Sequence, residues 1–232
     1  MARNPATAEE IPHFDGGLFG FLAELEANNE RAWFQENKAR YEAQARDPML
    51  RFIAALSEPL QAISRHFDAD PRPQGGSMFR IYKDTRFSRD KSPYKTHVAA
   101  QFRHRGCAEG VHGPGFYLHL QPGSSFAGGG LWHPEPEPLR QVRERIVSHS
   151  KAWRALRESG MEIEGESLKR VPQGFSAEHP FAEDLKLKDF YTSTTFTDRQ
   201  VCSRDFLERV AKAFQEAAPL VVFLAKAMDL PW

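Results

Sequence analysis

The first third of the chain has apolar residues at the spacing of amphipathic helices. From Gly17 they recur at i, i+3, i+4 and i+7, which predicts a helix with one apolar side. Asn28 and Asn29 are expected to end this helix and to cap a second one. A third helix is expected to begin at Pro48 and to bend or split at Pro59, because proline lacks the amide hydrogen that a helix interior uses. The apolar residues of these helices include Leu18, Phe21, Leu22, Leu25, Trp33, Phe34, Tyr41, Phe52, Ile53, Leu56, Leu60 and Ile63.

The period changes to that of β-strands after residues 68–77, a segment rich in turn-forming residues. Short aromatic and β-branched segments follow, and the links between them are too short for helical crossovers, so they predict a mainly antiparallel sheet. Glycines 128–130 within one of these segments predict a bulge or the close approach of another backbone. The expected strands are residues 78–82, 97–103, 116–121, 126–132 and 189–196.

Helical spacing returns in the second half of the chain, over residues 139–147 and 151–159. Residues 161–171 are expected to form a hairpin that turns at Glu164 and Gly165. The end of the chain, residues 203–228, predicts two helices divided at Pro219. Together these elements predict an α+β fold, in which a mainly antiparallel central sheet is packed by N-terminal and C-terminal helices.

The composition of the 232 residues is that of a folded protein, with 41% hydrophobic and 27% charged residues. Lys plus Arg and Asp plus Glu both number 31, so no net charge draws the whole chain to nucleic acid or membrane. Two cysteines are too few for a disulfide framework, and no apolar run predicts a signal peptide or a membrane span. We therefore expect a cytoplasmic protein, with a flexible tail over residues 1–12 and a single α+β domain over residues 13–232.

The most unusual segment is FRIYKDTRFSRDKSPYKTH, residues 79–97. Between residues 80 and 95 it carries six Lys or Arg and two Asp, a local charge of +4 in a chain of zero net charge. The segment opens as a strand and continues as a loop, which brings several cations together without burying them. Arginine binds carboxylate or phosphate through two hydrogen bonds, and lysine acts as a point charge. The expected ligand-binding residues are Arg80, Lys83, Asp84, Arg86, Asp90, Lys91, Tyr94, Lys95 and His97.

Two structural alternatives remain open for this segment. The alternation of Arg, Lys and Asp is equally typical of an ion-pair network that holds a long loop to its domain, with no ligand. The segment is also suited to contact an acidic partner. If it is an anion site, we expect the guanidinium groups of Arg80 and Arg86 to converge on a cleft beside the strand with glycines 128–130.

The same segment resembles the signature of a widespread bacterial family of conserved proteins of unknown function. The opening FDGGLFGFLAELEANNERAWFQENKARYE (residues 14–42) and the later GPGFYLHLQPGSSFAGGGLWHPEP (residues 113–136) are similar to that family as well. The resemblance runs from about Phe14 into the C-terminal helices. It implies an α+β domain and favours treating the charged residues of the basic segment as one unit. It implies no activity, cofactor or catalytic residue.

Other signals for chemistry are weak. Glycines 128–130 are followed by Leu-Trp, so the Lys and Ser or Thr of a phosphate-binding P-loop are missing. The nine histidines form no HExxH or HxH, so no metal site is predicted. Ser88 and Ser92 lack a GxSxG context and are interpreted as loop hydroxyls, and the aromatic residues of the second helix as core. Asn28, Asn29 and Asn37 are interpreted as helix caps or solvent contacts.

Three functions are compatible with these patterns. The first is binding of a small phosphorylated or carboxylated compound by the basic segment, with the reaction and any cofactor unassigned. The second is nucleic-acid binding, in which the cations contact phosphates and a tyrosine stacks on a base; the neutral total charge and the lack of a known nucleic-acid-binding signature argue against it. The third is a scaffold that binds an acidic partner. No membrane partner is expected, and the oligomeric state stays open.

Overall fold

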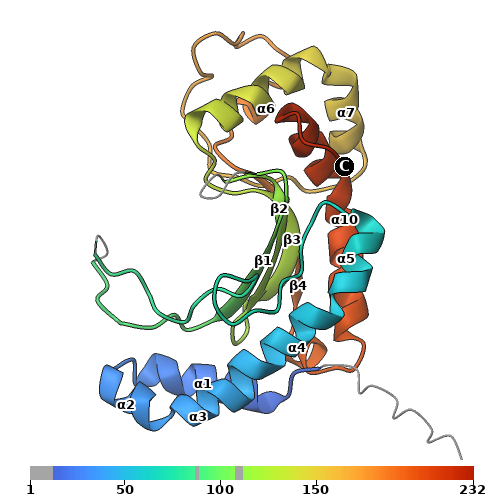
Figure 1. The fold of residues 1–232 in the computed structure, drawn as a ribbon. Coiled ribbons are helices and arrows are strands. Elements are labelled where there is room, and N and C mark those ends of the chain that lie inside the picture. Colours follow the sequence, from blue (N-terminus) through green and yellow to red (C-terminus); the bar gives the residue numbers. More distant parts are fainter. Residues whose placement is uncertain (1–12, 87–88, 108–111) are drawn as a thin grey trace, which may run out of the picture.

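The computed structural model describes residues 13–86, 89–107 and 112–232. The expected flexible tail, residues 1–12, lies outside the described residues. Within them, helices from both ends of the chain flank a four-stranded antiparallel sheet (Figure 1), so the predicted α+β fold is confirmed. No helix among the described residues is long and apolar enough to cross a membrane.

The sheet has its strands in the order of the sequence, so each strand pairs with its neighbour along the chain. Four of the expected strands are therefore confirmed, with shifts of at most one residue at their ends. The register aligns Gln101, Tyr117, Gly128 and Ser193 across the sheet. The strands are β1 (Val98–Arg103), β2 (Gly115–Leu120), β3 (Ser125–Leu131) and β4 (Phe190–Phe196).

The N-terminal helices form a layer that is drawn from blue to cyan in Figure 1. The carboxylate of Asp15 caps the first of them by accepting a hydrogen bond from the backbone N–H of Gly17 (2.8 Å). The break expected at Pro59 falls at Leu56 instead, because Pro59 lies in the first turn of the next helix, where its missing N–H has no partner to lose. The helices are α1 (Gly16–Ala27), α2 (Arg31–Glu36), α3 (Lys38–Tyr41), the π-helix η1 (Glu42–Arg46), α4 (Asp47–Ala55) and α5 (Ser57–Ile63).

The C-terminal half adds α6 (Pro136–Ser148), α7 (Ser150–Glu158), α8 (Ala182–Leu185), α9 (Asp198–Val201) and α10 (Phe206–Ala227). The prediction of two helices divided at Pro219 is wrong, since α10 is continuous over 22 residues. Pro219 is exposed, whereas its neighbours Ala217 and Leu220 are buried. Packing against the sheet therefore holds the helix together in spite of the proline.

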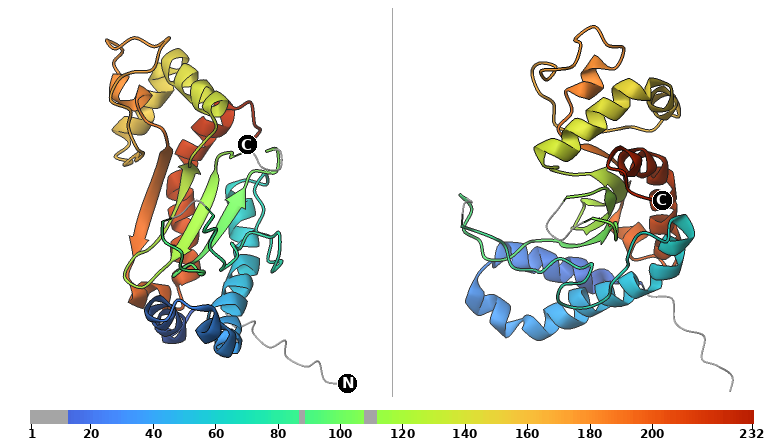
Figure 2. Two further views of the ribbon diagram at one scale, coloured as in Figure 1. Left: turned by 90° about the vertical axis from the view of Figure 1, so that its left-hand side faces the viewer. Right: turned by 45° about the horizontal axis from the view of Figure 1, so that its top comes forward.

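Helix α10 covers one face of the sheet. Phe214 lies 5.0 Å from Phe116 and 5.4 Å from Phe102, measured between ring centroids. At Gly128 an added Cβ would lie 2.0 Å from the carbonyl oxygen of Thr192, so the predicted close approach of another backbone is confirmed. The opposite face carries no helix among the described residues; it is turned toward the viewer on the left of Figure 2.

Two further strand predictions need correction. Residues 78–82 form no regular strand: Met78 pairs with Ala100 through an isolated bridge, after which the chain leaves the sheet. Residues 161–171 do not form a hairpin of their own. Glu164 pairs with Tyr191 on the outer side of β4 through two backbone hydrogen bonds of 2.8 and 3.1 Å. The pairing partner in both cases is a strand far along the chain, which local patterns do not reveal.

The buried apolar residues form two clusters. The first joins α1 to α5 with residues of all four strands and with α10 from Phe206 to Val221. The second joins α6, α7 and α8 with the ends of β3 and β4 and the C-terminal half of α10. Helix α10 thus belongs to both.

Candidate functional site

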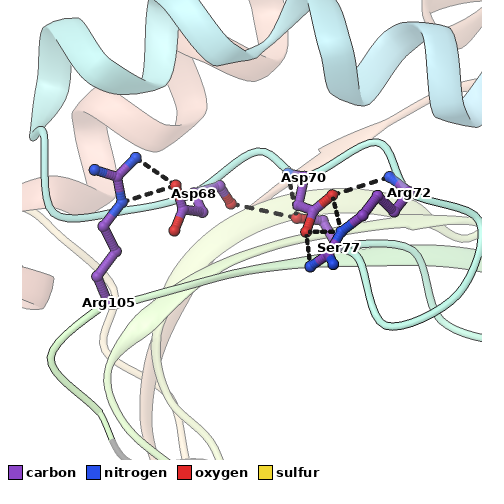
Figure 3. A network of polar contacts seen from close by, with 5 residues as sticks. All are labelled: Asp68, Asp70, Arg72, Ser77 and Arg105. Carbon is purple, nitrogen blue, oxygen red and sulfur yellow. Dashed lines mark hydrogen bonds and ion pairs between the residues drawn. The ribbon is translucent and has the colours of Figure 1, made fainter.

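A polar network holds the chain in place just before the basic segment (Figure 3). Arg105 donates to the carboxylate of Asp68 (Nε to Oδ1, 2.7 Å), and the backbone oxygen of Asp68 accepts from the Ser77 hydroxyl (3.3 Å). That hydroxyl accepts in turn from the backbone N–H of Asp70 (3.0 Å), whose carboxylate binds Arg72. The segment from Asp68 to Ser77 is therefore tied both to itself and to the residues that follow β1.

The network fixes the point at which the basic segment leaves the sheet. Beside it, Gly76 packs against backbone, because an added Cβ would lie 2.6 Å from the oxygen of Asp70. Gln101 then donates from its backbone to Ser77 (2.9 Å), and Phe79 donates to Ala99 (2.9 Å). After Phe79 the chain turns outward, away from β1 (Figure 1).

Residues 79–97, here called the basic arm, run out from the sheet and back. The two halves pair with each other through Lys83 N–H to Pro93 O (2.9 Å) and Lys95 N–H to Ile81 O (2.8 Å), around an isolated bridge between Tyr82 and Tyr94. In Figure 1 the arm extends to the left, beside the N-terminal helices. Its residues 87–88, including the candidate hydroxyl Ser88, lie outside the described residues.

The arm is bound to the helical layer through Tyr94. The side-chain amide of Asn29 donates to the backbone oxygen of Tyr94 (3.0 Å), and the N–H of Tyr94 donates to Asn29 Oδ1 (3.1 Å). The Tyr94 ring stacks on Phe34 of α2 at 4.0 Å, and burial raises the pKa of its hydroxyl. Asn29 is therefore not a solvent contact, and its partner 65 residues away could not be found from local sequence.

Two ion pairs stabilise the tip of the arm. Lys83 pairs with Asp90, and Arg86 donates two hydrogen bonds to Asp84 (3.0 and 2.7 Å). The bond from Arg86 lowers the pKa of Asp84 to about 2, and the bond from Lys83 lowers the pKa of Asp90 strongly. Two lysines bind the arm's own backbone: Nζ of Lys91 donates to Thr85 O (2.8 Å), and Nζ of Lys95 to Arg80 O (3.1 Å). Both ion pairs lie within the arm, so they differ from the expected network that would hold the loop to its domain.

The network leaves a surplus of positive charge. Of the six cations between residues 80 and 95, two are paired with the two aspartates. Arg80, Arg89, Lys91 and Lys95 form no ion pair with a carboxylate of the described residues. The local charge of +4 therefore stays available, and internal pairing does not exclude an anion ligand.

A pocket of about 310 Å³ opens where the arm meets α2. Lys83 of the arm and Arg31 of α2 bring two cations to it from separate elements. Arg31 forms no ion pair with any carboxylate in the described ranges. The only sequence signal for the α2 side was the i, i+4 spacing of Arg31 and Gln35, which places both on one side of a helix. The lining residues are Arg31, Gln35, Tyr82, Lys83, Thr85, Pro93 and Tyr94.

The pocket contains some of the predicted ligand residues and not others. Lys83 and Tyr94 line it, whereas Arg80, Asp84, Arg86, Asp90, Lys91, Lys95 and His97 do not. The expected convergence of Arg80 and Arg86 beside glycines 128–130 is not found. The arm pairs with β1, while those glycines lie in β3 with β2 between them, and the side chain of Arg86 is 77% exposed beside Asp84.

His97 lies at the sheet end of the arm, directly before β1. Its ring centroid is 4.3 Å from that of His119 on β2. Burial, followed by the nearby His119, Lys95 and Lys83, lowers the pKa of His97 to about 4, so the imidazole is neutral at pH 7.

Comparisons with known proteins agree with the sequence resemblance. The family model described as conserved hypothetical protein (DUF2461) matches residues 17–223, which include the helical layer, the basic arm and the sheet. Neither the curated proteins nor the solved structures give a match. Because the family model matches most of the chain, the chain belongs to the DUF2461 family of conserved hypothetical proteins.

Proposed function

We propose that the pocket between α2 and the basic arm binds the phosphate or carboxylate of a small molecule. The observation that carries this proposal is the meeting of Arg31 and Lys83, from separate elements, at one pocket, with four further cations of the arm forming no ion pair with a described carboxylate. The pocket's volume of about 310 Å³ is at the lower end of the range for small-molecule sites. No reaction or cofactor is assigned.

The lining residues divide the task of binding an anion. Arg31 supplies a planar guanidinium suited to two parallel hydrogen bonds, and Lys83 supplies a point charge. Gln35, Tyr82 and Thr85 add neutral donors around them. The ion pair with Asp90 already holds the side chain of Lys83 in place. An anion that binds in the pocket therefore does not have to order this side chain, and the lysine contacts both the anion and Asp90.

The alternatives use the same arm differently. A nucleic acid or an acidic protein would contact the exposed cations along the arm and would not require the pocket. Binding of octathymidylate that falls steeply with salt and is insensitive to Arg31→Ala would favour the nucleic-acid alternative. A cytoplasmic location is part of our proposal and is supported by Cys107 and Cys202, which are both free thiols.

The test is binding of inorganic phosphate, citrate and ribose 5-phosphate at millimolar concentration, measured by calorimetry. Arg31→Ala and Lys83→Ala should each weaken binding about tenfold or more, as loss of a charge-assisted hydrogen bond requires. Their matched controls are Arg51→Ala, an exposed arginine on α4, and Lys188→Ala, a lysine paired with Glu166 far along the chain. Failure of all three anions to bind, or equal losses in the controls, would overturn the proposal.

A further inference from the structure

The sheet face opposite α10 carries a group of half-buried rings near the base of the basic arm. His97, His119, Phe126, Tyr117 and Phe79, here called the ring cluster, come from the arm, β2 and β3. His119 stacks on Phe126 at 4.9 Å and 13°, and His97, directly before β1, lies 4.3 Å from His119. Tyr117 lies 5.7 Å from Phe126 and 6.1 Å from Phe79. No described helix covers this face (Figure 2), and the half-buried rings together with the exposed Phe79 form an aromatic floor.

Hydrogen bonds hold this floor in one uncharged state. Nε2 of His119 lies 3.0 Å from Gln121 Oε1, and Nδ1 of His119 lies 3.1 Å from the Tyr117 hydroxyl. The amide oxygen of Gln121 only accepts, so Nε2 carries the proton and Nδ1 accepts from Tyr117. Burial lowers the pKa of His119 and raises that of Tyr117 to about 12, so neither ionises near pH 7. Neutral, fixed rings are suited to stack on another planar ring.

Positive charge borders the ring cluster on the side of the arm. Nζ of Lys95 lies 5.1 Å from the centroid of Phe79, which is 39% exposed. Lys83, which lines the anion pocket, lies close enough for its charge to lower the pKa of His97. Tyr94, which lines the pocket, lies three residues before His97, so the chain between them spans at most about 11 Å and the pocket and the ring cluster are neighbours.

We infer that the ring cluster binds the planar ring of a ligand whose phosphate or carboxylate occupies the pocket between α2 and the basic arm. The inference rests on the proposed function and names its substrate class: an aromatic or heteroaromatic compound with an anionic group at a distance, such as a nucleotide. The cations of the pocket favour the anionic group of the ligand, and the ring cluster favours its planar ring. An anion without a ring uses only half of this surface.

The experiment compares adenosine 5′-monophosphate with ribose 5-phosphate, which differ by the base alone. The nucleotide should bind at least about fivefold more tightly, as stacking of one base on an aromatic side chain requires. Phe79→Ala should remove this advantage and leave ribose 5-phosphate unaffected. Trp132→Ala is the matched control, because Trp132 is also exposed (55%) but lies beyond the other end of β3. Addition of the nucleotide should shift the ring proton signals of His97 and His119 in NMR spectra, and ribose 5-phosphate should not.

The outcomes separate this inference from the proposal on which it rests. Equal affinity for the two compounds, with both weakened by Arg31→Ala, would overturn the ring subsite and leave the anion pocket standing. An advantage lost in Tyr82→Ala but kept in Phe79→Ala would place the ring on the exposed tyrosine of the pocket itself, and would also overturn it. Adenosine binding as tightly as the nucleotide, without any binding of ribose 5-phosphate, would overturn both.

Discussion

At the scale of the residue, His97 shows how the arm and the sheet change one another's chemistry. An isolated imidazole has a pKa of about 6.5 and titrates near neutrality. In the fold, burial and the neighbouring His119, Lys95 and Lys83 lower its pKa to about 4. The residue is thereby converted from a group that changes charge near pH 7 into a neutral ring.

The lowered pKa of His97 predicts a change of stability with pH that can be measured. Between about pH 6.5 and pH 4 the unfolded chain binds a proton at His97 that the folded chain does not. The free energy of unfolding should therefore fall as the pH decreases through this window, and this contribution should not change further below about pH 4. His97→Gln should flatten the fall, as measured by urea denaturation across the window. His149→Gln replaces an exposed histidine and should leave the slope as it is; equal slopes in all three proteins would contradict the prediction.

The sequence predicted the basic segment itself, but not the residues of the helical layer that contact it. The excess of cations and the presence of aspartates to pair with some of them follow from local composition. Arg31 and Asn29 were missed, because each acts on a segment more than 50 residues away and neither stands in an unusual local pattern. Long-range contacts of single polar residues leave no periodic signal.

At the scale of the element, the arm depends on the helical layer for its position. Its own pairing consists of a few backbone hydrogen bonds around one isolated bridge, and a two-stranded hairpin alone is marginally stable in water. Asn29 supplies two hydrogen bonds to the backbone of Tyr94, and the stack of Phe34 on Tyr94 adds an apolar contact. The contact with α2 is also one wall of the anion pocket. Docking of the arm and formation of the pocket are therefore one event.

Asn29→Ala should separate the arm from the helices. The change leaves the N–H and the carbonyl of Tyr94 without these partners, which should cost about 1–3 kcal/mol of unfolding free energy. Amide hydrogen exchange at Tyr94 and Lys95 should become faster. Asn28→Ala is the control, because the side chain of Asn28 donates to Glu24 O of its own helix at an exposed site. An equal effect of the two substitutions would contradict the docking role of Asn29.

Elements with strong periodicity were predicted well, and elements fixed by distant contacts were not. The first helices and β1 to β4 follow from spacing alone, since each buries one regular face. Residues 78–82 have the composition of a strand, but the network around Ser77 directs them away from the sheet after a single bridge. A proline usually interrupts the interior of a helix, but α10 continues through Pro219, because the burial of neighbouring residues in the core outweighs this local effect.

At the scale of the whole molecule, α10 and the sheet join two hydrophobic clusters. Phe214 of α10 belongs to the first cluster and Phe223 to the second, where it lies 4.9 Å from Trp153 of α7. Because one rigid helix contributes to both, neither cluster can lose its packing on α10 without exposing part of the other. We therefore predict that residues 13–232 unfold as a single domain.

Gly129→Ala tests this coupling. A Cβ at Gly129 would lie 2.8 Å from Val221 and 3.2 Å from Ala217, both in the first cluster, and such overpacking costs about 1–3 kcal/mol. Fluorescence of Trp153 in the second cluster, in a chain whose other tryptophans are replaced by Phe, should report the same loss. Gly20→Ala is the control, since an added Cβ in α1 meets nothing within 4 Å and alanine favours a helix. An unchanged midpoint for Trp153 in Gly129→Ala would show two independently folding units.

The irregular segments along the two outer strands have a consequence for the molecule in a crowded solution. A long bare strand at the margin of a sheet invites pairing with other chains and leads to aggregation. Here Phe67 and Met78 pair along the outer side of β1, and Glu164 pairs along that of β4, each through a short bridge followed by a turn away. Neither edge of the sheet therefore presents a long, straight strand. Edge-to-edge pairing between two copies of the chain is disfavoured as a result.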